Sequence, residues 1–322
     1  MNNSLLIASM LPTPPKNVRI NNVPKPLGIS SALLPIDRLM DASFFHSRKQ
    51  TSVFATVKKA VAPDRPICQD TTVIYVCDEF LLAAVLDGCG KYGHMLSEKV
   101  GEALLKITHE ERDKLSKNPD LRSLIVRATL QALFFMVPGT KINAGSTAVL
   151  TLLLSDGNFY SVNIGDSTQY VITKNAVKRL FTVDVIRYGE NSIPVTSLSL
   201  EEYDQLPKSP GSLWRYGIVG AVELKKGKLE PGDRLLLASD GTTDALSVKI
   251  DQTTGKILDI SGCDDIAKVI TPGVDVRVSI EELARLTLSE AYLESVLRYP
   301  IPKDVVRAPS FDDQSVILIG YD

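Results

Sequence analysis

Residues 71–88 read TTVIYVCDEFLLAAVLDG, and this stretch decides the fold class. Thr71–Cys77 and Phe80–Leu86 are β-prone runs separated by only two residues, so the sequence predicts an antiparallel hairpin. The second run is wholly apolar, which is typical of a buried strand. A buried strand holds the side chain that follows it at a fixed point at the edge of the core, and here that side chain is Asp87.

Two amphipathic helices are predicted after this hairpin. Apolar residues recur at helical spacing over Leu96–Ile107 and over Leu121–Phe135, and Asp120 is placed to cap the second helix. Short β-prone runs come next, joined by tight turns such as Asp156-Gly157, and we interpret them as an antiparallel meander. These runs are Ser146–Leu154, Phe159–Ile164, Gln169–Thr173 and Val177–Leu180.

The remaining elements complete a segregated pattern of strands and helices. Val53–Val61, Leu235–Ser239 and Ser315–Ile319 are further strand candidates. A capping box, Ser279-x-x-Glu282, predicts that a long helix begins there and continues through Leu283, Leu286, Ala291 and Leu297. Because strands and helices fall in blocks instead of alternating, the sequence predicts an antiparallel α+β fold and not a parallel β-α-β array.

Composition excludes several classes of protein. Of the 322 residues 44% are hydrophobic and 23% are charged, so the chain is neither disordered nor fibrous. Its 36 Lys and Arg against 38 Asp and Glu give a net charge of −2, which offers no support for binding nucleic acid. No apolar run approaches the roughly 18 residues of a membrane-spanning helix. The four cysteines lack disulfide or zinc-site spacing, so we expect reduced thiols in an intracellular protein.

The N-terminal region differs from the rest of the chain. Residues 11–35 contain six of the 18 prolines, which forbid regular helix and disfavour an interior strand. We therefore interpret residues 1–40 as a proline-rich extension or wrapping arm, in preference to a docking segment. Residues 41–322 are predicted to form a single catalytic domain.

Acidic residues that directly follow strands carry the functional signal. Asp87-Gly88 and Asp240-Gly241 each end an apolar run, although an Asp-Gly pair alone is more often a turn, as we expect for Asp156-Gly157. Asp240 differs because the sequence after it heads into helix and places Asp244 four residues on.

Further acids occupy similar positions. They are Asp166, the pair Asp312-Asp313 before the last strand, and Asp70, which lies close to Arg65. If these carboxylates converge without His or Cys, they form an oxygen-only site of the kind that Mg²⁺ or Mn²⁺ prefers. The alternative is that they are unrelated surface acids.

Taken together, these motifs resemble those of the metal-dependent protein phosphatases, the type 2C serine/threonine phosphatases, most closely in their plant-like form. The resemblance runs from about Thr51 to Tyr321, and its motifs keep the order of the family. They are Arg65 with Cys68-Gln69-Asp70, Asp87-Gly88-Cys89-Gly90-Lys91-Tyr92-Gly93-His94, Ala144-Gly145-Ser146-Thr147-Ala148, Asn163-Ile164-Gly165-Asp166-Ser167, Ala238-Ser239-Asp240-Gly241-Thr242-Thr243-Asp244 and Asp312-Asp313-Gln314-Ser315-Val316.

The resemblance implies a fold and a set of ligands. The fold is an antiparallel β-sandwich flanked by helices on both faces, in αββα layers. Two Mn²⁺ or Mg²⁺ ions and a third, weaker one are implied. Asp87 would bridge the first two ions. Asp240 and Asp312 would complete one of them, the carbonyl of Gly88 would bind the other, and Asp70 would act through bound water. Asp166 and Asp244, with Asp240, would bind the third ion.

The resemblance also implies an activity. A hydroxide that bridges the two cations would attack phosphoserine or phosphothreonine in line, with no covalent intermediate. Arg65 would bind two phosphate oxygens, and its alternative is a surface ion pair with Asp64 or Asp70. The expected partners are phosphoprotein substrates, with no nucleic acid and no membrane. We expect the protein to be a monomer located in the cytoplasm and also in the nucleus.

Several positions depart from the family pattern. Cys89 stands where the family usually has His, Gln69 replaces a carboxylate found in many members, Asp313 replaces Asn and Thr168 replaces Arg. His94 we assign to the start of a helix and not to catalysis. These departures leave two alternatives, a silent pseudophosphatase that acts as a binding module, and another two-metal hydrolase acting on nucleotides or small phosphoesters.

Overall fold

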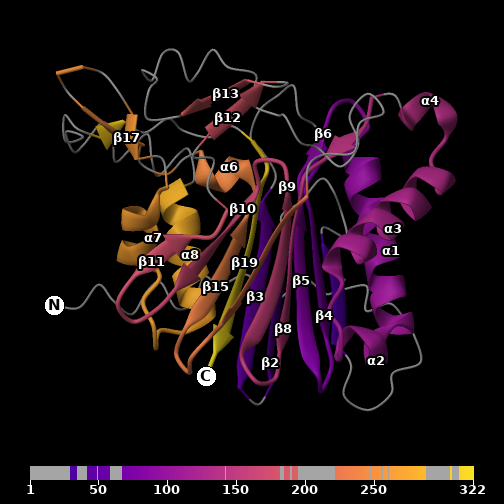
Figure 1. The fold of residues 1–322 in the computed structure, drawn as a ribbon, viewed down its shortest axis with the longest axis horizontal. Helices are drawn as coiled ribbons and strands as arrows, with labels where there is room; N and C mark the ends of the chain where they lie inside the picture. The colour runs from indigo at the N-terminus through magenta and orange to yellow at the C-terminus, as the bar shows by residue number, and fades with distance from the viewer. Residues whose placement is uncertain are drawn as a thin grey trace, which may run out of the picture.

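Two antiparallel sheets pack face to face, with helices on both outer faces (Figure 1). This arrangement, in a computed structural model, confirms the predicted α+β sandwich. The structure describes residues 30–34, 42–48, 50–58, 67–141, 143–181, 185–188, 191–194, 222–244, 246, 248–251, 253–254, 257–259, 261–287, 305–306 and 312–322.

Each of the two large sheets has six strands. The first sheet has the order β1 (Ser30–Leu34), β4 (Thr71–Val76), β5 (Phe80–Leu86), β8 (Ala148–Leu154), β9 (Asn158–Ile164) and β14 (Glu223–Lys228). The second has the order β11 (Val177–Arg179), β10 (Thr168–Ile172), β15 (Arg234–Ala238), β19 (Gln314–Tyr321), β3 (Thr51–Lys58) and β2 (Ala42–Arg48). Small strands lie outside these sheets: β6 (Gly88–Cys89) with β7 (Gly145–Ser146), β12 (Val185–Tyr188) with β13 (Asn191–Pro194), and β16 (Val248–Ile250) with β17 (Ile257–Asp259) and β18 (Val305–Val306).

Helices cover the outer face of each sheet. The first sheet lies under α1 (Gly93–Glu110) and α3 (Leu121–Phe135), and the second under α7 (Cys263–Val269) and α8 (Val276–Thr287). The predicted cap is confirmed, because the Asp120 carboxylate accepts a hydrogen bond from the Ser123 amide at 3.0 Å. Short helices are α2 (Arg112–Leu115), α4 (Pro138–Lys141) and α6 (Asp240–Thr243). Among the helices that the structure describes, none has the length and apolar character needed to cross a membrane.

Strand β5 is apolar throughout because both of its faces are buried. Leu81, Ala83 and Val85 belong to the core between the sheets. Leu82 and Ala84 belong instead to the core under α1 and α3. The predicted hairpin with β4 is also confirmed, with Val76 opposite Leu81 and the Cys77 amide donating to the Phe80 carbonyl at 3.0 Å. Asp87 follows directly at the edge of the core.

The predicted meander over residues 146–180 is wrong in its connectivity. β8 and β9 pair in the first sheet, whereas β10 and β11 pair in the second. The chain crosses between the sheets at residues 165–167, where Gly165 has a φ of 98° that other residues rarely adopt. Local hydrophobic pattern does not distinguish a hairpin from such a crossing, and the crossing carries Asp166.

The predicted capping box at Ser279 is also wrong. α8 begins three residues earlier, and its first turn is capped by Asp275, whose carboxylate accepts from the Arg277 amide at 2.8 Å. Ser279 is buried inside the helix, where its hydroxyl accepts a hydrogen bond from the buried Arg234 at 3.1 Å. The continuation of this helix through Ala291 and Leu297 lies outside the described residues.

One strand comes from the proline-rich region. β1 lies at the edge of the first sheet and pairs with β4, with Ala32 opposite Ile74. The first sheet therefore includes residues that precede position 41, the predicted start of the catalytic domain. An edge position accords with the prediction that this region contributes no interior strand.

Candidate metal centre

Three carboxylates from distant parts of the chain meet at one end of the sandwich. Asp87 follows β5, Asp166 lies in the crossing between β9 and β10, and Asp240 opens α6 after β15. One oxygen from each of these side chains lies within 4.8 Å of the others. The three acids that come together belong to three of the sequence motifs, so these motifs form one site.

Close backbone packing brings these segments together. A Cβ atom at Gly88 would lie 2.4 Å from the Gln69 carbonyl oxygen, and a Cβ at Gly241 would lie 2.0 Å from the Asp313 carbonyl oxygen. Neither approach is possible with a side chain, because real Cβ atoms do not come so near backbone atoms. Glycine after Asp87 and after Asp240 is therefore a packing requirement. Gly157 meets the same requirement, because its Cβ would lie 2.6 Å from the Leu229 carbonyl oxygen, and it also has the positive φ of a hairpin turn.

Two further acids lie behind this group. Asp70 and Asp313 are both almost fully buried. The Ser315 hydroxyl donates to Asp70 Oδ2 at 2.7 Å, and the Gln69 amide donates to Asp313 Oδ2 at 2.7 Å. These hydrogen bonds hold the segment before β4 against the start of β19, so that Asp70 is fixed beside the three-acid group.

Burial and mutual repulsion disfavour the charged form of these acids. Desolvation, followed by the charge of Asp313, raises the pKa of Asp70 from 3.8 to about 8. Desolvation and the charge of Asp240 raise the pKa of Asp166 to about 7. The pKa of Asp87 is likewise raised well above its usual range, first by burial and then by the charges of Asp240, Asp70 and Asp166. Such a cluster is costly unless positive charge enters it.

The chemistry of the donors fits a hard divalent cation. Within the part of the chain that the structure describes, Asp166 Oδ1 and Asp240 Oδ1 are buried and have no hydrogen-bond partner. Buried carboxylate oxygens are normally satisfied, so two such atoms in one cluster fit the coordination of a positively charged ligand. All the converging ligands are oxygen, which suits Mg²⁺ or Mn²⁺ better than zinc.

The other predicted ligands lie around this group at different distances. Asp312 is half-buried, with its Cβ 3.3 Å from the ideal Cβ position of Gly241, and its carboxylate accepts from the Asp313 amide at 2.8 Å. It is not one of the three acids whose oxygens converge. Asp244 ends α6, where it is exposed and contributes to the raised pKa of Asp166. Arg65, the predicted phosphate ligand, lies outside the described residues.

The departures from the family pattern occupy defined places. Cys89 is half-buried in β6, opposite Gly145 of β7, and none of the four cysteines forms a disulfide. His94 lies in the first turn of α1, so its predicted place at the start of a helix is confirmed. Gln69 joins three segments, since its side chain also donates to the Gly90 carbonyl at 2.9 Å.

Thr147 is a residue that sequence reasoning missed. Its hydroxyl accepts from the Asp87 amide at 3.3 Å and lies 2.6 Å from the Ser167 hydroxyl, while its own amide donates to the Asp87 carbonyl at 2.8 Å. Thr147 therefore ties the loop of Asp87 to the crossing that carries Asp166. The sequence could have identified Thr147 by its place in the Gly-Ser-Thr-Ala motif, because a motif without charged residues can act by positioning the metal-binding residues.

Thr147→Val is expected to weaken Mn²⁺ binding by about 10- to 100-fold, as for other residues that orient metal ligands. The substitution keeps the shape of the side chain and removes both hydroxyl contacts, so the Asp87 loop loses its link to Asp166. Isothermal titration calorimetry measures the change, and Thr147→Ser, which keeps the hydroxyl, is the matched control. Equal Mn²⁺ affinity in wild type and Thr147→Val would contradict this positioning role.

Comparison with known proteins places this geometry in a family. The profile of protein phosphatase 2C matches residues 64–261. Among solved structures, the PPM Ser-Thr phosphatase MsPP from Mycobacterium smegmatis, in complex with cacodylate, is similar with a TM-score of 0.53 and 20% identity, covering 89% of this chain and 100% of that one. A search of curated proteins gave no match.

Two other solved structures contain divalent cations. The catalytic domain of the serine threonine protein phosphatase PstP, in complex with two manganese ions, has a TM-score of 0.50 and 17% identity, covering 84% of this chain and 97% of that one. RsbX in complex with magnesium has a TM-score of 0.50 and 14% identity, covering 87% of this chain and 100% of that one. At these identities the likeness is one of fold. Because the family match spans more than half of the sequence, and acids from three of its motifs meet in one place, the chain belongs to the protein phosphatase 2C family, the serine/threonine phosphatases that its motifs resemble.

Proposed function

We propose that this protein removes phosphate from phosphoserine and phosphothreonine in proteins by direct attack of water, using two Mn²⁺ or Mg²⁺ ions held by its converging carboxylates. The observation that carries the proposal is the cluster of Asp87, Asp166 and Asp240, in which two buried oxygens lack any partner among the described residues. Bound divalent cations lower the pKa of coordinated water and neutralise charge on phosphoryl oxygens.

The chain's own residues then have distinct roles in this proposal. Asp87 lies at the centre of the group and would contact both cations, and Asp240 would hold one of them together with Asp312. The Gly88 carbonyl and Asp70 would complete the coordination, with Asp70 fixed by the Ser315 hydroxyl. Asp166 and Asp244 would serve a third, weaker cation. Arg65 would bind the phosphoryl oxygens of the substrate through its planar fork of donors.

Metal removal tests the proposal directly. Hydrolysis of a phosphothreonine peptide is expected to stop in EDTA and to return when Mn²⁺ is added in excess, because the converging carboxylates would bind the cations that activate water. Malachite-green detection of released phosphate measures this. Absence of turnover at every Mn²⁺ and Mg²⁺ concentration would overturn the proposal.

Two further outcomes separate the alternatives. Mn²⁺ binding by calorimetry without any hydrolysis would identify a pseudophosphatase, for which Cys89 and Gln69 are the motivating substitutions. Faster turnover of free nucleotides than of phosphopeptides would identify a different two-metal hydrolase.

We propose further that the protein acts on phosphoproteins as a cytoplasmic monomer without nucleic-acid partners. Its net charge of −2 supports the last point. Light scattering of the purified protein at several concentrations tests the oligomeric state, and a mass of twice 35.2 kDa would contradict it.

A further inference from the structure

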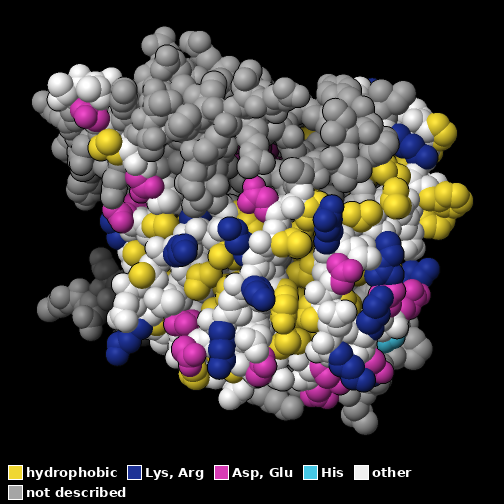
Figure 2. Space-filling model, viewed as in Figure 1, with side chains coloured by type: hydrophobic (Ala, Val, Ile, Leu, Met, Phe, Trp, Pro, Cys, Tyr) yellow, Lys and Arg dark blue, Asp and Glu magenta, His cyan; other side chains and the backbone are white. Residues whose placement is uncertain are grey.

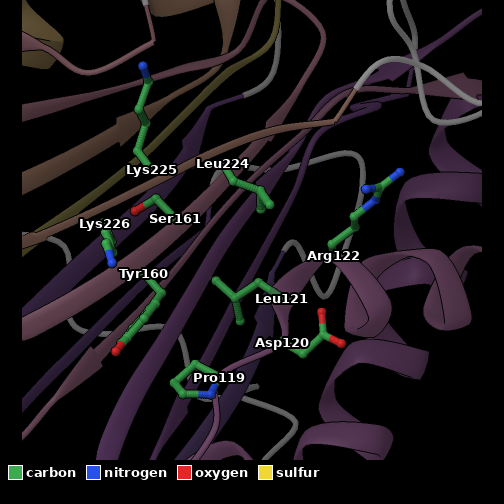
Figure 3. Close-up of a pocket in the computed structure, with 9 residues that line it drawn as sticks. All are labelled: Pro119, Asp120, Leu121, Arg122, Tyr160, Ser161, Leu224, Lys225 and Lys226. Atoms are coloured by element: carbon green, nitrogen blue, oxygen red, sulfur yellow. The ribbon is translucent and has the colours of Figure 1, made fainter.

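A groove lies at the β14 edge of the first sheet, away from the metal centre. It has a volume of about 350 Å³ and runs between the start of α3 and the strands β9 and β14. Figure 3 shows the side chains of Leu121 and Leu224 between α3 and β14. The lining residues are Pro119, Asp120, Leu121, Arg122, Tyr160, Ser161, Leu224, Lys225 and Lys226.

The floor of the groove is apolar and its surroundings are positively charged. Leu224 is 55% exposed, so an apolar side chain faces solvent at the groove. Arg122, Lys225 and Lys226 form no ion pair with any residue that the structure describes, and the single acid of the lining, Asp120, is engaged as the cap of α3. The molecular face in Figure 2 shows Lys and Arg side chains, with Asp and Glu side chains among them, around a central group of hydrophobic ones.

The register of β14 shows which backbone groups point outward. The Leu229 amide donates to the Gly157 carbonyl at 2.9 Å, and the same register places Lys225 opposite Ser161. Hydrogen-bonded pairs alternate along an antiparallel ladder, so Lys225 bonds to β9, whereas the amides and carbonyls of Leu224 and Lys226 point away from it. β14 is the last strand of its sheet in the described part of the chain.

Side chains on β14 alternate between the two faces of the sheet. Leu224 lies opposite Val162, which belongs to the core under α1 and α3, so Leu224 and Lys226 are on the α3 side. Lys225 is on the opposite side. A strand added beside β14 would therefore place alternate side chains over the Leu121 and Leu224 floor and the remainder next to Lys225.

We propose that this groove binds an extended acidic segment of a partner protein, which adds to the first sheet as a strand beside β14. The outward amides and carbonyls supply main-chain hydrogen bonds, the apolar floor accepts an apolar side chain, and the unpaired cations attract acidic ones. Lysines on an edge strand also discourage pairing with other sheets. That protection is weakest against a negatively charged strand, which is why the occupant is acidic.

Peptide binding tests this inference independently of catalysis. A short fluorescein-labelled peptide of alternating Glu and Val is expected to bind wild-type protein in fluorescence anisotropy, and to bind more weakly as salt is raised. The double substitution Lys225→Glu and Lys226→Glu is expected to weaken binding by about tenfold or more, because attraction becomes repulsion. Lys174→Glu, at an exposed turn of the second sheet, is the matched control and leaves binding unchanged.

Amide hydrogen exchange on the wild-type protein gives a second readout that needs no substitution. Peptide binding is expected to slow exchange at Leu224 and Lys226, whereas Lys225, already bonded to β9, is protected in both states. No binding of the acidic peptide, equal binding by the doubly substituted protein, equal binding of a peptide with Lys in place of Glu, or binding without protection at Leu224 and Lys226 would each overturn the inference. None of these results depends on whether the protein hydrolyses phosphopeptides.

Discussion

Asp240→Asn is expected to abolish cation-dependent phosphatase activity and, at the same time, to make the metal-free protein more stable. Apart from burial, Asp240 is the largest source of repulsion on both Asp87 and Asp166, since its charge raises the pKa of each. Replacing it with a neutral amide of the same shape removes that repulsion. It also removes a carboxylate from the three-acid group.

The two effects have opposite signs because the cluster serves a ligand and not the fold. Charge neutralisation by a bound cation is worth several kcal/mol in phosphoryl transfer, so loss of the ligand is expected to lower kcat by roughly 10³-fold or more. Without metal, the melting temperature of Asp240→Asn is expected to exceed that of wild type. Added Mn²⁺ is expected to raise the melting temperature of wild type and to have little effect on the variant.

Asp156→Asn is the matched control for this experiment. Asp156-Gly157 also follows an apolar strand, but it forms the hairpin turn between β8 and β9, where the Asp156 carboxylate accepts from the Asn158 amide at 3.0 Å. Asn-Gly is well suited to such turns, so the control keeps both activity and the response to Mn²⁺. Full activity in Asp240→Asn would show that this carboxylate is not needed to hold a cation. A metal-free protein destabilised by the substitution would show that Asp240 serves the fold.

This contrast shows what the sequence could predict about the site. Asp240-Gly241 and Asp156-Gly157 look alike locally, and the helix after Asp240 was the signal that separated them. The choice between Asp312 and Asp313 could not be made in the same way. It depends on how the start of β19 meets Gln69 and Gly241, residues more than 70 positions away, and the structure buries Asp313 while leaving Asp312 half-exposed.

The fold was predictable where burial dominates the pattern. β5 and β15 lie between a second sheet and a helix layer, so they are apolar on both faces and stand out in the sequence. β14, with the sequence ELKKGK, was missed because it is an exposed edge strand whose pairing with β9 depends on backbone hydrogen bonds. The crossing at residues 165–167 was missed for a related reason, since nothing local indicates to which sheet the next strand belongs.

Metal-free protein is expected to lose stability as the pH rises from 5.5 to 8.5, which is the second large effect that the cluster produces. The folded-state pKa is about 8 for Asp70 and about 7 for Asp166, compared with 3.8 in the unfolded chain. Between these values the folded protein binds protons that the unfolded chain has released, so the free energy of unfolding falls with increasing pH. The contribution of Asp70 and Asp166 to the stability of the folded protein is fully present below pH 3.8, and it is lost as the pH rises through their folded-state pKa values of about 8 and about 7.

Other shifted carboxylates do not mask this trend. Ion pairs with Arg127 and Arg277 lower the pKa of Glu111 and Asp275 to about 2. Stability that depends on a lowered pKa is present above the unfolded-state value and is lost only on acidification. Glu111 and Asp275 are therefore ionised throughout the range from pH 5.5 to 8.5, and they contribute no change in stability within it.

Thermal unfolding in EDTA at a series of pH values measures the effect. Each 1 kcal/mol of lost stability lowers the melting temperature by about 2–4 °C in a domain of this size, so we expect a fall of several degrees. Asp70→Asn is expected to flatten the profile, because the amide does not titrate and so removes the carboxyl group whose pKa burial and the charge of Asp313 raise. Asp156→Asn is expected to leave the profile unchanged. Mn²⁺ is expected to reverse the trend, since cations bind the deprotonated carboxylates and stabilise the protein more as the pH rises. A metal-free melting temperature that stays constant or increases towards pH 8.5 would mean that Asp70 and Asp166 are ionised without cost, and the argument that their cluster requires a cation would fail.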